Sequence, residues 1–94
     1  MKELNKMKTI KWQDLKFEPH QLVLGGVQCI IDLDNGEWCS IVGAEPSNDG
    51  MMLCGDGVNT FEIMSSSTEK TKNGVKGWLT KTQVLRHLNF LNNK

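Results

Sequence analysis

The chain has 94 residues and a mass of 10.6 kDa, which predicts one domain, because two cores would each bury too little apolar surface to offset chain entropy. Hydrophobic residues make up 38% and charged residues 23%, as in a globular domain rather than a disordered chain. Apolar runs are too short for a membrane span, and three unevenly spaced Cys favour a reducing compartment. We therefore expect a cytoplasmic protein with a flexible N-terminus at residues 1–8 and a single domain at 9–94.

The net charge of zero hides three blocks of opposite sign. Residues 1–16 carry five Lys against two acids, residues 17–62 carry eight acids and no Lys or Arg, and residues 63–94 carry six bases against one acid. Two interpretations stay open. The basic ends fold back and neutralise the acidic middle, or an acidic surface remains exposed and attracts a basic partner.

The segment before the first strand signal has no clear period. Ile10, Trp12, Leu15 and Phe17 fit a short strand or a helical turn, and Pro19 ends the segment. We expect an irregular or extended conformation here.

The clearest signal is a hairpin over residues 27–42, where two β-rich runs flank Asn35-Gly36. Asn-Gly supplies the positive φ angles of a two-residue type I′ turn, which would pair Leu33 with Trp38. Because side chains alternate along a strand, one face then points to the core and the other outward. The predicted core face holds Val27, Cys29, Ile31, Leu33, Trp38 and Val42. The predicted outer face holds Gln28, Ile30, Asp32, Cys39 and Ile41.

The next part of the chain gives weaker signals. Residues 44–50 read as a loop, and residues 51–54 and 58–64 predict a second hairpin with a turn at residues 55–57 and Leu53, Phe61 and Ile63 in the core. Residues 65–77 predict a long polar loop, and such loops are often mobile or functional.

The last element is a helix from about Thr80 to Asn92. Thr80 and Gln83 have the spacing of a capping box, and Val84, Leu88 and Leu91 form one apolar stripe. The whole pattern predicts an α+β fold, a small antiparallel β-meander of about four strands with one C-terminal helix packed on one face.

No residue pattern predicts metal or catalytic chemistry. His87 has no second ligand one helical turn away, His20 follows Pro19 in a turn, and the three cysteines lack a C-x-x-C spacing. The predicted hairpin register also puts Cys29 and Cys39 on opposite faces, which would prevent a disulfide. We expect no cofactor, no metal and no enzymatic activity.

Direct nucleic-acid binding is the obvious role for a basic segment. Lys70, Lys72, Lys76 and Lys81 could contact phosphates while Trp78 stacks on a base. The chain lacks a recognition-helix motif, however, and its middle is acidic, so the sequence argues against this role.

Four short motifs resemble a group of small, uncharacterised proteins encoded by tailed bacteriophages. In order they are Gly26-Val27-Gln28, Asp32 to Gly36, Ser40-Ile41-Val42 and Gly77-Trp78-Leu79-Thr80. The resemblance spans residues 25–91 and implies an accessory protein that works in the cytoplasm of an infected bacterium. By analogy with such proteins, it implies binding and inhibition of a host protein, such as a host-defence component.

Two functional hypotheses follow. In the first, the protein inhibits a host protein without turnover through its acidic middle, with Glu45, Asp49 and Asp56 as loop contacts. In the second, an oligomer sequesters a nucleotide or another anionic signalling molecule. The residues predicted to hold that ligand are Lys72, Lys76, Trp78, Lys81 and Arg86.

Exposed apolar residues predict self-association. Ile30 and Ile41 would form a patch on the outer face of the hairpin, and Phe90 lies off the core stripe of the helix. We expect a homo-oligomer, most simply a two-fold dimer. The alternative is that the N-terminal segment covers the outer face within one chain.

Overall fold

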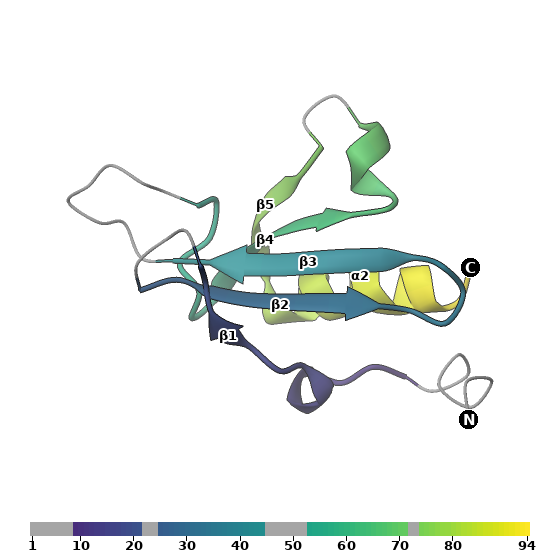
Figure 1. The fold of residues 1–94 in the computed structure, drawn as a ribbon, viewed down its shortest axis with the longest axis horizontal. Coiled ribbons are helices and arrows are strands. Elements are labelled where there is room, and N and C mark those ends of the chain that lie inside the picture. The colour runs from purple at the N-terminus through teal and green to yellow at the C-terminus, as the bar shows by residue number, and fades with distance from the viewer. Residues whose placement is uncertain (1–8, 22–24, 45–52, 72–73) are drawn as a thin grey trace.

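The computed structural model describes residues 9–21, 25–44, 53–71 and 74–94. In chain order they form the 3-10 turn η1 (Trp12–Asp14), strands β1 (Glu18–Pro19), β2 (Val27–Asp32), β3 (Trp38–Gly43) and β4 (Thr60–Ser65), the 3-10 turn η2 (Thr68–Lys70), strand β5 (Lys76–Thr80) and helix α2 (Lys81–Asn92). The strands make one antiparallel sheet in the order β1-β2-β3-β4-β5 (Figure 1). The predicted α+β meander with a C-terminal helix is confirmed, with five strands instead of about four.

The hairpin between β2 and β3 lies where predicted, but its turn is one residue longer. The Leu33 N–H donates to the Glu37 carbonyl, and the Gly36 N–H donates to the Leu33 carbonyl. Only Gly36 has a positive φ, of 88°, so Asp34, Asn35 and Gly36 form a three-residue loop in place of the type I′ turn. Asn35 contributes through its side chain, which donates to the Leu91 carbonyl at 2.8 Å.

The longer loop shifts the pairing of β3 by one residue. Ile31 pairs with Cys39 and Cys29 with Ile41, so Cys39 and Ile41 join the core face. Trp38 and Val42 face the other way, against prediction. Because side chains alternate along a strand, a shift of one residue moves every β3 side chain to the opposite face.

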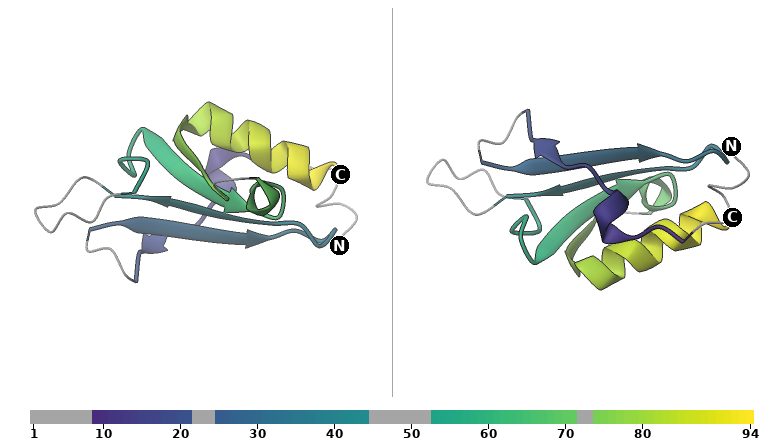
Figure 2. Two further views of the ribbon diagram at one scale, coloured as in Figure 1. Left: turned by 90° about the horizontal axis from the view of Figure 1, so that it is seen from above. Right: turned by 90° about the horizontal axis from the view of Figure 1, so that it is seen from below.

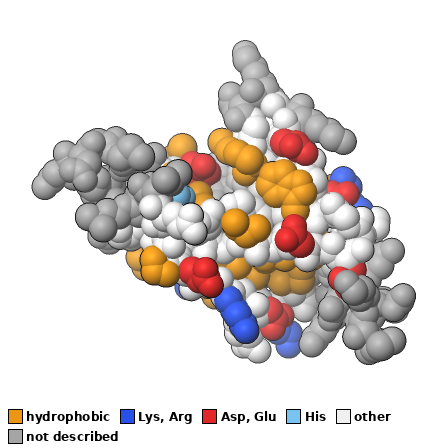
Figure 3. All heavy atoms as spheres, viewed as in Figure 1, with side chains coloured by type: hydrophobic (Ala, Val, Ile, Leu, Met, Phe, Trp, Pro, Cys, Tyr) orange, Lys and Arg blue, Asp and Glu red, His pale blue; other side chains and the backbone are white. Residues whose placement is uncertain are grey.

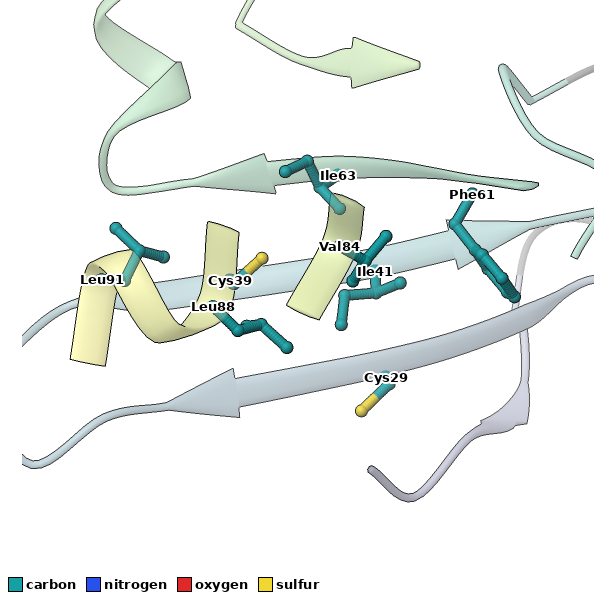
Figure 4. Close-up of a cluster of buried hydrophobic side chains, with 8 residues drawn as sticks. All are labelled: Cys29, Cys39, Ile41, Phe61, Ile63, Val84, Leu88 and Leu91. Atoms are coloured by element: carbon teal, nitrogen blue, oxygen red, sulfur yellow. The ribbon is translucent and has the colours of Figure 1, made fainter. Parts of the chain in front are cut away.

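Helix α2 covers one face of the sheet (Figure 2). Its buried apolar residues Val84, Leu88 and Leu91 point toward the strands, as Figure 4 shows. The core cluster consists of Cys29, Cys39, Ile41, Phe61, Ile63, Val84, Leu88 and Leu91. The predicted capping box is confirmed, since the Gln83 N–H donates to Thr80 Oγ1 at 3.2 Å and the Thr80 N–H donates to Gln83 Oε1 at 2.8 Å.

The N-terminal segment completes the covering layer on the helix side. Ile10, Trp12, Leu15 and Phe17 pack against the core cluster, and the Trp12 ring lies 5.0 Å from that of Phe61. The predicted alternative, in which this segment covers the outer face of the hairpin, is wrong. These side chains instead fill the space beside α2 that one helix leaves open.

Two hydrogen bonds fasten the segment to the helix. The Ile10 N–H donates to Asn89 Oδ1 at 2.7 Å, and Asn89 Nδ2 donates back to the Ile10 carbonyl at 3.1 Å. Asn89 therefore pairs with the backbone of Ile10 as a neighbouring strand would.

The region before β4 differs from the predicted hairpin. Residues 51 and 52 lie outside the described residues, and residues 53–59 form a loop whose Gly55 carbonyl accepts from the Ala44 N–H. Strand β4 pairs with β3 on one side and with β5 on the other, and β5 lies at the end of the predicted polar loop. The sequence gives no strand signal for β5, because Lys76 to Thr80 include one Gly and no β-branched apolar residue.

Strand β5 contains a bulge at Trp78. The pairing shifts by one residue between Phe61 and Ile63, and Trp78 has a φ of 58°. Its N–H donates to the Cys54 carbonyl, and its side chain is 55% exposed. Trp78 is therefore not a core residue.

Candidate functional site

The face of the sheet opposite α2 carries the candidate site. Cross-strand pairing places three rows of side chains there, Glu18 with Gln28, Val42 and Glu62, then Ile30 with Ser40 and Met64, then Asp32 with Trp38. We call these nine residues the open face. Ile30 is 62% exposed and Met64 43% exposed, whereas Ile41 and Ile63 on the covered face are fully buried.

The open face has an apolar centre and acidic charges around it. Figure 3 shows hydrophobic side chains gathered over the strands with acidic side chains beside them. The charged members are Glu18, Asp32 and Glu62. Lys76, the single Lys or Arg within the five strands, pairs with Ile63 and so lies on the covered side.

The acidic side chains of the open face form no ion pair with the basic ends within the described ranges. Lys94 Nζ lies 3.7 Å from Glu37 Oε1, which links the end of α2 to the start of β3. No such ion pair involves Glu18, Asp32 or Glu62 among the residues that the structure describes. The Glu62 carboxylate does accept a hydrogen bond from the Cys54 N–H at 2.9 Å.

The three acidic loop residues predicted to contact a partner are not part of the open face. Glu45 and Asp49 lie outside the described residues. Asp56 Oδ1 accepts hydrogen bonds from the N–H groups of Thr60, Val58 and Asn59 at 3.0, 2.8 and 2.8 Å, which lower the pKa of Asp56 to about 2. This carboxylate therefore holds its own loop in shape.

The predicted oligomer patch does not exist as a single surface. Ile41 lies in the core, so its predicted exposure beside Ile30 is wrong. Ile30 faces Ser40 on the open face, whereas Phe90 lies on α2 on the covered side with Lys94 Nζ 5.5 Å from its ring centroid. Phe90 is 55% exposed, as predicted from its position off the core stripe.

The predicted basic residues come together only in part. Lys76 and Arg86 line one surface groove of about 340 Å³ with His87 and Phe90. Burial lowers the pKa of His87, and the positive charges of Lys76 and Lys94 lower it further.

The other members of that basic set lie elsewhere. Lys81 Nζ lies 5.4 Å from the Trp12 ring centroid, and Trp78 does not line the groove. Lys72 lies outside the described residues.

One contact resembling catalytic machinery was missed by the sequence analysis. Ser65 Oγ lies 2.9 Å from His87 Nε2, although the two residues are 22 positions apart. Ser65 is fully buried, and its Oγ also accepts from the N–H groups of Ser67 and Thr68. The hydroxyl therefore organises the turn after β4 and is out of reach of a substrate.

The cysteines are free thiols. Cys29 and Cys39 lie on the same face of the hairpin, against prediction, because of the shifted register. Burial raises the pKa of both thiols, that of Cys39 to about 12. Within the described ranges, no three His, Cys, Asp or Glu side chains gather as metal ligands would.

None of the helices in the described parts of the chain has the length and apolar character needed to cross a membrane.

Comparisons with protein-family models, curated proteins and solved structures found no match. The open face itself is thus the basis for assigning a function.

Proposed function

We propose that the protein acts without turnover, by binding a basic protein through its open face. The observation that carries this proposal is a face of the described strands that combines exposed Ile30 and Met64 with three carboxylates and includes no Lys or Arg of those strands. Protein interfaces commonly have an apolar centre and a polar rim, and Trp and Met are enriched in them. Trp38, Ile30 and Met64 supply such a centre.

The charge on the open face selects the type of partner. A second copy packed face to face would bring carboxylates against carboxylates, which costs free energy, whereas Lys and Arg side chains would be attracted. The partner is therefore a protein with a basic surface around exposed apolar residues. The resemblance to phage proteins supports a host protein in the cytoplasm of an infected bacterium, such as a defence component, as the inhibited partner.

The acidic residues that meet the partner differ from those that the sequence suggested. Asp56 is committed to its loop, so Glu18, Asp32 and Glu62 become the acidic residues that meet the partner. The buried position of Ser65 supports binding rather than hydrolysis as the activity. A homodimer through Phe90 is compatible with this arrangement, because Phe90 lies on the covered side, and light scattering at micromolar concentration would test it.

The test compares substitutions on and off the open face. Asp32→Lys changes an exposed charge on the face, and Glu69→Lys makes the same change on η2, outside the strands. Met64→Asp removes an exposed apolar side chain from the face, and Val58→Asp does so in the loop before β4.

Capture from a bacterial lysate should yield one basic polypeptide with the wild-type chain and with both off-face variants. Asp32→Lys and Met64→Asp should each reduce its recovery at least tenfold, and added salt should weaken capture by the wild type. Equal recovery with all four variants, or capture of an acidic polypeptide only, would refute the proposal.

The groove beside α2 supports a second candidate, the binding of an anionic nucleotide. Lys76 and Arg86 could meet phosphate there while Phe90 packs on the base. Titration with ADP, followed by NMR, should shift resonances of the groove residues, and Arg86→Glu should abolish the shifts. Lys81→Glu is the matched control, because Lys81 lies over Trp12. Unchanged spectra, together with no nucleotide released from the purified protein, would contradict nucleotide binding. Open-face binding would then be the one remaining candidate function.

A further inference from the structure

Among the described residues, only the first two residues of β2, Val27 and Gln28, have a strand partner on its outer edge. The bond from the Leu33 N–H to the Glu37 carbonyl identifies Leu33 and Glu37 as a hydrogen-bonded pair. Such pairs alternate along antiparallel strands, so the backbone groups of Ile30 and Asp32 point away from β3. They point toward the side on which β1 lies.

Strand β1 is too short to reach these groups. It has two residues, and their partners are Gln28 and Val27. N-terminal to β1, the chain leaves the edge and passes to the covered side, where Leu15 packs against the core. No backbone hydrogen bond from the described residues reaches Ile30 or Asp32 on this edge.

A groove runs along this edge. Two adjoining hollows of about 300 and 310 Å³ share Asp14, Leu15, Ile31 and Asp32 as lining residues, and we call them together the β2-edge groove. Leu15 and Ile31 supply apolar surface, and Asp14 and Asp32 supply negative charge. Lys16 lines only the hollow that also contacts Cys29, so one end of the groove is acidic and the other is mixed.

We propose that the β2-edge groove receives an extended segment of the basic partner, which pairs with Ile30 and Asp32 as an added strand in line with β1. Unpaired N–H and C=O groups on a strand edge are a template for such pairing. Alternate side chains of the segment would point to opposite sides of the sheet. Apolar ones would reach Leu15 and Ile31, and basic ones would lie beside Asp32.

The inference rests on the proposed function, because it identifies one part of the same partner. The open face and the β2-edge groove meet at Ile30 and Asp32, whose side chains belong to the face and whose backbones belong to the edge. One partner can therefore contact both.

A defined peptide tests the edge without knowledge of the partner. The probe is acetyl-Lys-Val-Lys-Val-Lys-amide, and its matched control is the same peptide with Glu in place of Lys. Amide hydrogen exchange of the full chain is followed by NMR at Ile30 and Asp32. With the Lys peptide at about ten times its Kd, exchange at both amides should slow about tenfold, and the Glu peptide should not slow it.

Two results would overturn the inference. One is unchanged exchange at both amides with saturating Lys peptide. The other is slow exchange at both amides in the peptide-free protein, which would mean that the edge is already occupied. Deletion of residues 2–8, or dilution of the protein, would then identify the chain's own N-terminus or a second copy as the occupant.

A pair of substitutions separates the edge from the face. Ile30→Pro removes the N–H that points into the groove and leaves the bonds to β3, whereas Ile30→Ala removes the side chain and keeps the N–H. In Ile30→Pro, the Lys peptide should no longer slow amide exchange at Asp32. In Ile30→Ala, the peptide should still slow it. If Ile30→Pro retains it, the strand pairing is wrong, while loss of capture with Met64→Asp would still support the proposed function.

Discussion

The covered and the open face are built by the same strands, β2, β3 and β4, but their side chains experience different constraints. On β3, Cys39 and Ile41 are enclosed between the strands and α2, while Ser40 between them faces outward. On the covered face, volume and shape decide which side chain fits. On the open face, Ile30 and Met64 are 62% and 43% exposed, so the described chain restricts their volume and shape much less. The same substitution should therefore have different effects on the two faces.

The largest expected effect comes from truncation on the two faces. Ile41→Ala should reduce the free energy of unfolding by about 2–5 kcal/mol, because a fully buried side chain leaves a cavity. Ile30→Ala should change it by less than about 0.5 kcal/mol, because that side chain is mostly exposed. Urea denaturation of both variants measures the difference, and equal losses would show that the open face is covered in solution.

The next largest expected effect is the loss of stability when the N-terminal segment, which covers part of the core, is no longer bonded to α2. Asn89→Ala removes both hydrogen bonds to Ile10, so stability should fall by about 1–3 kcal/mol. Asn93→Ala is the control, because Asn93 Nδ2 donates only to the Asn89 carbonyl at an exposed site. Thermal denaturation measures both variants. A loss with Asn93→Ala as large as that with Asn89→Ala would contradict the fastening role of Asn89.

A smaller effect is expected at the start of the helical cover. Thr80→Ala leaves the Gln83 N–H without its cap and should cost about 1 kcal/mol. Thr80→Ser keeps a hydroxyl at the same position and should cost less. Denaturant titration distinguishes these variants, and identical stabilities would mean that packing alone holds the first turn.

The smallest expected effect is the pH dependence of stability that comes from Asp56, the carboxylate that is held by its own loop and does not lie on the open face. The folded-state pKa of Asp56 is about 2, below its ordinary value of 3.8, so its contribution to stability is present above pH 3.8. That contribution should be lost as the pH falls through 3.8 and then through about 2. NMR titration of the Asp56 carboxyl carbon measures the pKa, and Asp56→Asn should increase amide exchange at Val58 and Asn59. A pKa near 3.8 would show that the three N–H bonds do not form in solution.

Local signals in the sequence predicted the elements that local chemistry controls. The capping box at Thr80 and Gln83 marked the start of α2, and Asn35-Gly36 marked the hairpin. The predicted hairpin register was wrong because Asn-Gly occurs both in a two-residue turn and at the end of a three-residue loop. In the three-residue loop Asn35 also donates to the Leu91 carbonyl, 56 positions away, a contact that no local pattern contains.

Other features depend on contacts that no local pattern contains. The short strand β5 forms beside β4, and Gly77 is needed there because any side chain at this position would collide with Cys54. The sequence did not predict the open face for a related reason. Glu18, Asp32 and Glu62 were visible as members of an acidic block, but their shared location follows from the register of four strands.

The pair of hydrogen bonds between Ile10 and Asn89 has a consequence for how the chain folds. The two residues are separated by 79 positions, nearly the full length of the chain. Closing so long a loop has an entropic cost that must be met before the contacts it permits are gained, and proteins rich in distant contacts fold slowly. During synthesis, the strands leave the ribosome before the helix that covers them. The covered face therefore lacks its helix until residues 84–91 emerge, and such exposed apolar surface makes a nascent chain prone to aggregate.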